Sequence, residues 1–434
     1  MKLHDRDRPL TFHWTARDLE WVELLGLPSA HSRNFADARS AVLLNAIRPA
    51  QGTPHWISYS RNHNHYNRAR RRYHGRAFTC ANVTRAVDQA AEFGFVESQV
   101  AEQGALGKQS RFRATAKLLR STMDIPAVYQ PSELIRLKDI NGRLIDYRDT
   151  DATCRMRREI AAINEAISSV GLDLVEPEVT REETIIRIGD AVVYPEMKSL
   201  WRIFSRGSFA KHGRMYGGWW QCVPKHARAF LTINREPVAE PDYPSHHCRM
   251  CYVLAEAAIP IGDLHSISGW ETEDGRKLCK LAFNILINAD TQSKALAALA
   301  QKIEGRKYTT TASREKAAAV IDAVVQRHKP VANLFCTDAA MTLMRFDSEM
   351  ALLVVSCLID RGIVALPIHD SFVVQQRYEG ELREAMDEAW VAFCSGKITK
   401  SFQRDSRKQS YKRATLPGGA TLPVTVVPAA RRAA

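Results

Sequence analysis

The segment Ala365-Leu-Pro-Ile-His-Asp-Ser-Phe-Val-Val374 places two polar residues between two short apolar runs. The first run ends at Ile368, the polar pair is His369-Asp370, and the second run begins at Phe372. Two short strands joined by a tight turn fit this pattern. The turn would hold the Asp370 carboxylate at the tip of a rigid hairpin, where it could bind a hard cation such as Mg²⁺. Aspartate is also a common turn residue, so this segment alone leaves both interpretations open.

A second aspartate ends another apolar stretch. In Val238-Ala-Glu-Pro-Asp242-Tyr-Pro-Ser245, Asp242 precedes a segment, residues 245–258, that has the apolar spacing of a helix. Asp242 would therefore lie where a strand passes into a helix. It is 128 positions (370 − 242) from Asp370, so only the fold can bring the two together. Carboxylate pairs of this kind hold two metal ions about 3.5–4 Å apart in phosphoryl-transfer sites.

A third segment, residues 275–288, predicts an amphipathic helix with Asp274 as its N-cap. Four polar residues recur along it at every fourth position: Arg276, Lys280, Asn284 and Asn288. On a helix they form one polar stripe that drifts slowly around the axis. The stripe is either an ordinary solvated face or a surface that presents two cations to a triphosphate.

In their order and spacing these segments resemble motifs of family A DNA polymerases and of the single-subunit phage RNA polymerases. Residues Asp242 to Arg249 resemble motif A, Arg276-x-x-x-Lys280 resembles motif B, and His369-Asp370 resembles motif C. The resemblance covers about residues 200–395. It implies a right-hand polymerase core in which Asp242 and Asp370 bind two Mg²⁺ ions and Lys280 takes part in catalysis. The substrates would be nucleoside triphosphates and a DNA template with its primer, as in a compact polymerase of a phage or mobile element.

The same resemblance implies a set of nucleotide-binding residues, namely Arg276, Lys280, Tyr243, His247, Asn284 and Asn288. Three positions depart from the DNA polymerase pattern. Asn288 stands where a tyrosine is expected, His247 stands where the DNA polymerases have glutamate, and Ser371 follows motif C as in the RNA polymerases. In the family that the chain resembles, the residue five positions after the motif A aspartate packs under the incoming sugar. We expect the bulky His247 to exclude a ribose, although its ring could instead hydrogen-bond a 2′ hydroxyl.

The composition indicates a polyanionic partner. The chain has 434 residues, a formal net charge of +13 and a pI of about 9.4. No apolar stretch is long enough to span a bilayer, and nine scattered cysteines do not suggest a disulfide framework. We expect a cytoplasmic monomer with no membrane partner.

The N-terminal part predicts a second binding element. Residues 81–93 read as a helix that ends at Gly94, and residues 95–97 and 111–115 read as strands around a glycine-rich tip. This order resembles a winged helix-turn-helix, and a small αβ packing module is the alternative. The residues expected to contact nucleic acid are Arg70, Arg71, Arg72, Arg85, Lys108, Arg111 and Arg113, together with Arg214 and Arg228 of the polymerase-like part.

These observations predict an α/β (α+β) protein with four regions. Residues 1–120 would form the helical and winged-helix module, and residues 121–200 a thumb-like connector with a hairpin at Asn141-Gly142 and basic helices. Residues 201–395 would form the palm with a fingers insertion over about residues 270–330, and residues 396–434 a basic disordered tail.

A DNA polymerase is the preferred function. An RNA polymerase or primase of the same fold, a catalytically inactive DNA-binding replication initiator or regulator, and an enzyme that adds nucleotides without a template remain alternatives.

Overall fold

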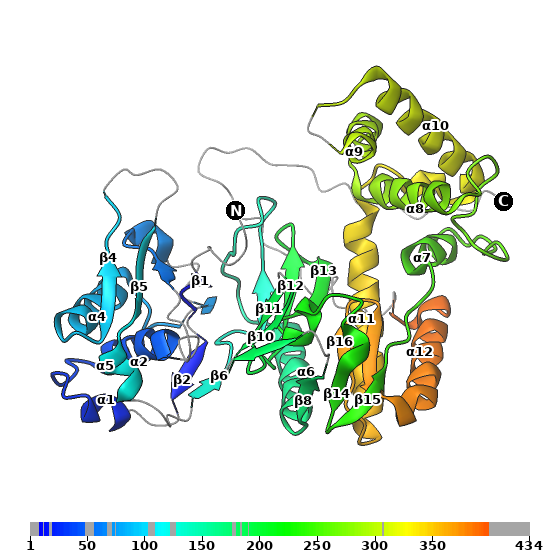
Figure 1. Cartoon of the computed structure of the whole chain (residues 1–434). Helices are drawn as coiled ribbons and strands as arrows, with labels where there is room; N and C mark the ends of the chain where they lie inside the picture. The colour runs from blue at the N-terminus through cyan, green and yellow to red at the C-terminus, as the bar shows by residue number, and fades with distance from the viewer. Residues whose placement is uncertain are drawn as a thin grey trace.

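The computed structural model shows a mixed α/β protein (Figure 1). It describes residues 8–11, 13–16, 20–47, 56–66, 72–73, 75–102, 109–121, 127–175, 179–182, 185–189, 191–305 and 308–398. Two buried hydrophobic clusters divide these residues, one within residues 14–118 and the other within residues 135–398. Of the helices in the described part, none is both long and apolar enough to cross a membrane.

The predicted hairpin is confirmed. Strands β16 (Leu366–Ile368) and β17 (Ser371–Gln375) pair antiparallel, with Ile368 opposite Ser371, so His369 and Asp370 form a two-residue turn. His369 adopts a left-handed backbone conformation (φ 60°), as such tight turns require. All residues of both strands are buried, which explains why the hairpin sequence is apolar on both faces.

The hairpin belongs to a five-stranded sheet with the order β16-β17-β15-β14-β8. Its other strands are β15 (Glu236–Ala239), β14 (Leu231–Ile233) and β8 (Leu172–Leu174), and every neighbouring pair is antiparallel. Helix α7 (His246–Leu254) follows β15. It is shorter than the predicted helix over residues 245–258, because Glu256 takes a left-handed conformation (φ 52°).

Helix α11 (Ala339–Asp360) lies at the centre of this half of the molecule (Figure 1). It contacts strand β13 (Ser208–Tyr216) and helix α12 (Glu379–Cys394). A second sheet has the order β13-β12-β7, formed with β12 (Trp201–Ser205) and β7 (Ile135–Leu137). The fully buried Arg202 of β12 donates from Nη2 to Glu349 of α11 at 2.7 Å, so an ion pair fixes the helix to the sheet.

Three helices form a unit above α7 and the upper end of α11 (Figure 1). They are α8 (Glu273–Asn288), α9 (Gln292–Glu304) and α10 (Thr311–Arg327). The N-cap of α8 is Thr272, whose hydroxyl accepts a hydrogen bond from the Gly275 amide, and not Asp274 as predicted. Helices α9 and α10 are separate, because Gly305 ends α9 in a left-handed conformation and Thr310 caps α10.

Residues 127–193 differ from the predicted connector. Helix α6 (Asp151–Ser168) buries Met156, Ile160 and Ile163, and it is the single helix among the described residues of this region, where several were expected. The Asn141-Gly142 turn is present, yet its arms share one isolated bridge, Lys138 with Leu144, because β7 pairs in parallel with β12. The remaining strands are β6 (Ala127–Tyr129), β9 (Thr180–Glu182), β10 (Ile185–Ile188) and β11 (Ala191–Val193).

The N-terminal unit contains the predicted helix and strand pair. Helix α4 (Cys80–Glu92) leads into the antiparallel strands β4 (Val96–Gln99) and β5 (Ser110–Ala114). Strand β3 (Ile57–Tyr59) pairs with the other edge of β5, and the sheet order is β1-β3-β5-β4. The other elements are β1 (Arg8–Pro9), β2 (Trp14–Ala16), α1 (Glu20–Leu24), α2 (Arg33–Ile47) and α5 (Ala116–Arg120).

Buried histidines generate a testable pH dependence. Burial lowers the pKa of His265 and of His328 from the ordinary value of 6.5 to about 4. The unfolded chain therefore binds more protons between pH 6.5 and pH 4, and the stability that these neutral rings provide is lost as the pH falls through that range. We expect the free energy of unfolding to drop by about 1–2 kcal/mol per histidine between pH 7 and pH 5.

The measurement is urea unfolding at the two pH values. His328→Asn should reduce the pH dependence, because an amide can keep the contact with Tyr252, whose hydroxyl lies 3.0 Å from His328 Nδ1. Replacing the exposed His226 by Asn is the control and should leave the pH dependence as it is. Equal pH dependence in all three proteins would contradict the expectation.

Candidate active site

The two predicted metal-binding aspartates lie side by side. Asp242 forms an isolated antiparallel bridge with Ser371, the residue after Asp370. The Tyr243 amide donates to the Asp370 carbonyl at 3.4 Å, and the Phe372 amide donates to the Pro241 carbonyl at 3.3 Å. The chain leaving β15 thus runs along the hairpin turn, and the fold brings together the backbones of two aspartates that are far apart in the sequence.

The surroundings of this pair fit a hard divalent cation. Asp242 is exposed and Asp370 is half-buried, and neither carboxylate makes a hydrogen bond or an ion pair with another described side chain. In the described ranges there is no cluster of three or more His, Cys, Asp and Glu residues that could hold a metal. A cation here would take two carboxylates from the protein and its other ligands from water, backbone or substrate phosphates. Mg²⁺ is commonly bound in this way.

A third acid beside the pair is already neutralised. Glu240 accepts hydrogen bonds from Arg228 Nε at 2.9 Å and from the Ser371 hydroxyl at 2.8 Å. The Arg228 side chain is 14% exposed and forms an ion pair with the same carboxylate. Arg228 therefore supports the sheet next to Asp242, and its guanidinium is not free for the nucleic-acid contact predicted for it.

Tyr243 also has a structural role. Its hydroxyl donates to the Met386 carbonyl of α12 at 2.6 Å, and its ring stacks on His246 with centroids 4.6 Å apart. Burial raises the pKa of this phenol well above its ordinary value. The prediction that Tyr243 binds the nucleotide is not supported, because its polar atom is occupied by a backbone carbonyl.

His247 and Arg214 meet at a buried carboxylate that the sequence did not single out. Arg214 of β13 donates from Nε to Asp347 Oδ2 at 2.6 Å, and its Nη2 lies 3.2 Å from His247 Nε2. Asp347 is 2% exposed and lies within α11. Arg214 is thus an interior residue and not the surface contact to nucleic acid that was predicted. A lone aspartate in the apolar run from Met341 to Leu358 was the available signal for Asp347.

His212 and Tyr216 of β13 form a row of polar side chains that reaches His369 in the hairpin turn. The His212 Nε2 atom is 2.9 Å from the Tyr216 hydroxyl, and the Tyr216 ring lies 5.4 Å from that of His369. Burial lowers the pKa of His212 to about 4 and also lowers the pKa of His369. Both rings are therefore neutral at neutral pH, so they place no positive charge next to Asp370.

The predicted polar stripe of α8 is present. Gly275, Cys279, Phe283 and Leu286 are buried on the inner face, and the stripe lies on the outer face. Lys280, Asn284 and Asn288 are exposed, whereas Arg276 forms an ion pair with Asp263. In the part of the chain that the structure describes, Lys280 has no ion-pair partner, so its ammonium is available to a phosphate.

The predicted basic residues of the N-terminal unit have different surroundings. Arg111 and Arg113 lie 4.4 and 4.5 Å from the ring of Trp56, on the sheet face of β5. Arg85 of α4 lies 5.1 Å from the Phe35 ring and is exposed. Three further residues, Arg70, Arg71 and Lys108, fall outside the described residues.

Arg72 joins the two halves of the chain. It forms ion pairs with Glu133 at 3.3 Å, Asp146 at 2.7 Å and Asp149 at 3.1 Å, and it donates to the Tyr147 carbonyl. Its donors are therefore occupied by protein acceptors. The predicted phosphate contact of Arg72 is replaced by this structural role.

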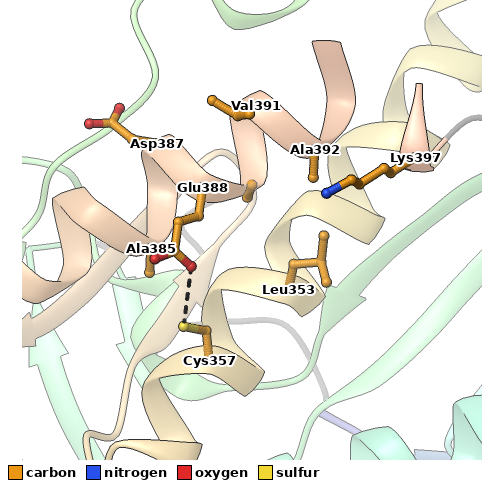
Figure 2. A pocket seen from close by; sticks show the side chains of 9 residues that line it. Leu353, Cys357, Ala385, Asp387, Glu388, Val391, Ala392 and Lys397 are labelled. Atoms are coloured by element: carbon orange, nitrogen blue, oxygen red, sulfur yellow. Dashed lines mark hydrogen bonds between the residues drawn. The ribbon is translucent and has the colours of Figure 1, made fainter. Parts of the chain in front are cut away.

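A groove of about 550 Å³ lies between α11 and α12 (Figure 2). Leu353 and Ala392 supply apolar surface, and Cys357 Sγ lies 3.8 Å from Glu388 Oε2. Neither Asp242 nor Asp370 lines it. The groove is thus distinct from the carboxylate pair.

Comparison of the chain with protein-family models, with curated proteins and with solved structures finds no match. Its function has therefore to be inferred from its own side chains and their arrangement.

Arg214 is assigned a structural role and Lys280 a surface position, and the free energy of unfolding of two variants tests this difference. Arg214→Met would leave the Asp347 carboxylate buried without its main partner, and we expect a loss of about 3–5 kcal/mol. Lys280→Met changes an exposed, unpaired side chain and should stay within about 0.5 kcal/mol of wild type. Urea unfolding of both variants at neutral pH gives the comparison. A similar loss in the two variants would show that these structural and surface assignments are incorrect.

Proposed function

We propose that this chain is a template-directed nucleic-acid polymerase that adds nucleotides to a 3′ hydroxyl with Mg²⁺, and that it uses deoxynucleotides. The observation that carries the proposal is the backbone adjacency of Asp242 and Asp370 where β15 ends and β17 begins. The polar stripe on α8, with the exposed Lys280, supplies the second expected part of such a site.

In this proposal the five-stranded sheet and α11 serve as the palm, and α8, α9 and α10 serve as the fingers. Helix α6 packs in the same buried cluster as the sheet, so it would support the palm and would not project as a thumb. Asp242 and Asp370 would hold two Mg²⁺ ions. Bound there, the metal would lower the charge of the triphosphate and favour ionisation of the 3′ hydroxyl.

The roles of the remaining residues follow from their exposure. Lys280 would contact the triphosphate directly, with Asn284 and Asn288 beside it on the same face. Arg276 would contact the triphosphate only after its ion pair with Asp263 breaks, so the phosphate would replace the Asp263 carboxylate as its partner. His247, five positions after Asp242, would lie under the sugar and exclude a 2′ hydroxyl.

The N-terminal unit would bind the DNA template. Its succession of α2, β3, α4, β4 and β5 resembles a winged helix, with β1 as an additional strand in the sheet order β1-β3-β5-β4. The exposed side of α4 carries Asp88, paired with Arg61, and Glu92, which disfavours a helix that approaches phosphates. We assign the DNA contact to the sheet face with Trp56, Arg111 and Arg113, where Arg113 would exchange its ion pair with Glu97 for a phosphate.

The carboxylate pair is tested by isosteric replacement. Asp242→Asn and Asp370→Asn should each abolish primer extension, because a neutral amide binds Mg²⁺ much more weakly than a carboxylate, while folding and DNA binding remain. Primer extension with deoxy and ribo substrates on DNA and RNA templates is the measurement. The control is Asp360→Asn, which changes an exposed aspartate at the end of α11. Near-normal extension by either site variant would exclude the two-metal site.

The DNA contact is tested through its salt dependence. Arg111→Ala and Arg113→Ala in the full chain should each lower the slope of log affinity against log salt by about 1, since each removes one phosphate contact. Fluorescence anisotropy with duplex DNA at several salt concentrations gives the slopes. Arg33→Ala removes an exposed arginine paired with Asp37 and should keep the wild-type slope. If all the slopes agree, this sheet face does not bind DNA.

A further inference from the structure

Asp347 is a buried anion with no part in the chemistry proposed above. Taking a carboxylate out of water costs several kcal/mol unless partners compensate it. Burial alone would raise the pKa of Asp347, but Arg214, His246 and His247 hold that pKa well below its ordinary value. The side chain is therefore ionised inside the protein, and the groups around it are arranged to keep it so.

Those groups come from two other elements. Arg214 of β13 places two nitrogens on the same oxygen, with Nε at 2.6 Å and Nη2 at 2.5 Å from Oδ2. His246 Nε2 lies 3.5 Å from the other oxygen, and His247 Nε2 lies 3.7 Å from Oδ2. Arg214 Nη2 is also 3.2 Å from His247 Nε2, so one guanidinium connects the carboxylate with the histidine ring.

This contact fixes the start of α7. The helix begins after Ser245, which is left-handed (φ 50°) and gives no side-chain cap. Its first turn is held instead through side chains, with His246 stacked on Tyr243 and His247 turned toward Arg214. The His247 side chain keeps 17% exposure, so its inner edge is held and its outer part remains accessible.

We propose that Asp347 is a positioning residue for sugar selection, which holds the His247 ring in one orientation through Arg214. This inference rests on the proposed polymerase function. It adds that Asp347 determines how well the His247 ring distinguishes deoxynucleotides from ribonucleotides. A ring free to rotate would leave room for a 2′ hydroxyl during part of its motion. A loss of about 1.4 kcal/mol of discrimination corresponds to a tenfold change in selectivity.

The test is single-nucleotide insertion with matched deoxy and ribo substrates. The ratio of their kcat/KM values is measured for wild type, Asp347→Asn, His247→Gly and the double variant. His247→Gly should raise relative ribonucleotide use most, and Asp347→Asn should raise it by about tenfold. The double variant should match His247→Gly alone, because Asp347 acts through that ring.

A neighbouring carboxylate on α11 provides the matched control. Glu349 forms ion pairs with Arg202 of β12 and Arg345 of α11. Among the described residues, neither of these two partners belongs to α7. Glu349→Gln should therefore lower stability without changing the sugar ratio. Should Asp347→Asn fail to fold, Arg214→Lys replaces it, because lysine keeps the charge and loses the second nitrogen that reaches His247.

Three outcomes would overturn the proposal, and they are distinguishable. An unchanged ratio in Asp347→Asn, with a changed ratio in His247→Gly, shows that Asp347 does not position the ring. An equal shift from Asp347→Asn with and without His247 shows that it acts by another route. A wild-type protein that inserts no nucleotide removes the proposed function itself, and this inference with it.

Discussion

The pairing of β15 with β17 is the contact on which the rest of this half of the molecule depends. Val238 lies opposite Gln375 and Ala239 opposite Val374, and the backbone contacts continue past the strand ends to Asp242. This ladder joins segments that are more than a hundred residues apart. The long helix α11 and the helical unit α8–α10 occupy the intervening sequence, so both are placed by the closure of this one antiparallel pair.

Local patterns explain what could be predicted. The apolar runs around His369-Asp370 specify a hairpin, and the four-residue spacing from Arg276 to Asn288 specifies a helix with one polar face, because each pattern is complete within a short segment. The juxtaposition of Asp242 with Asp370 was predicted from a resemblance and not from periodicity. The first residue of a helix is harder to predict. Thr272 and Asp274 are both good N-cap types, and which of them caps α8 depends on where the backbone becomes helical.

Arginine partners could not be predicted in this way. Arg72, Arg214 and Arg228 look like surface cations in the sequence, and each is bound to a carboxylate of another segment, which lies far along the chain for Arg72 and Arg214. The sequence shows the charge of a residue but not which acid the fold brings to it. The count of 61 lysine and arginine residues therefore overstates the number of cations that remain for a polyanion. The cations left exposed, such as Lys280, are the more informative ones.

The two buried clusters have a consequence for cooperativity. Met197 and Trp201 pack against the N-terminal cluster, and the ion pairs of Arg72 connect that half with residues 133–149. Units with separate cores unfold as separate transitions unless their interface is strong. Part of this interface is ionic, and Asp146 and Asp149 are half exposed, so salt weakens it more than it weakens either core. Raising the ionic strength should therefore favour separate unfolding of the two halves.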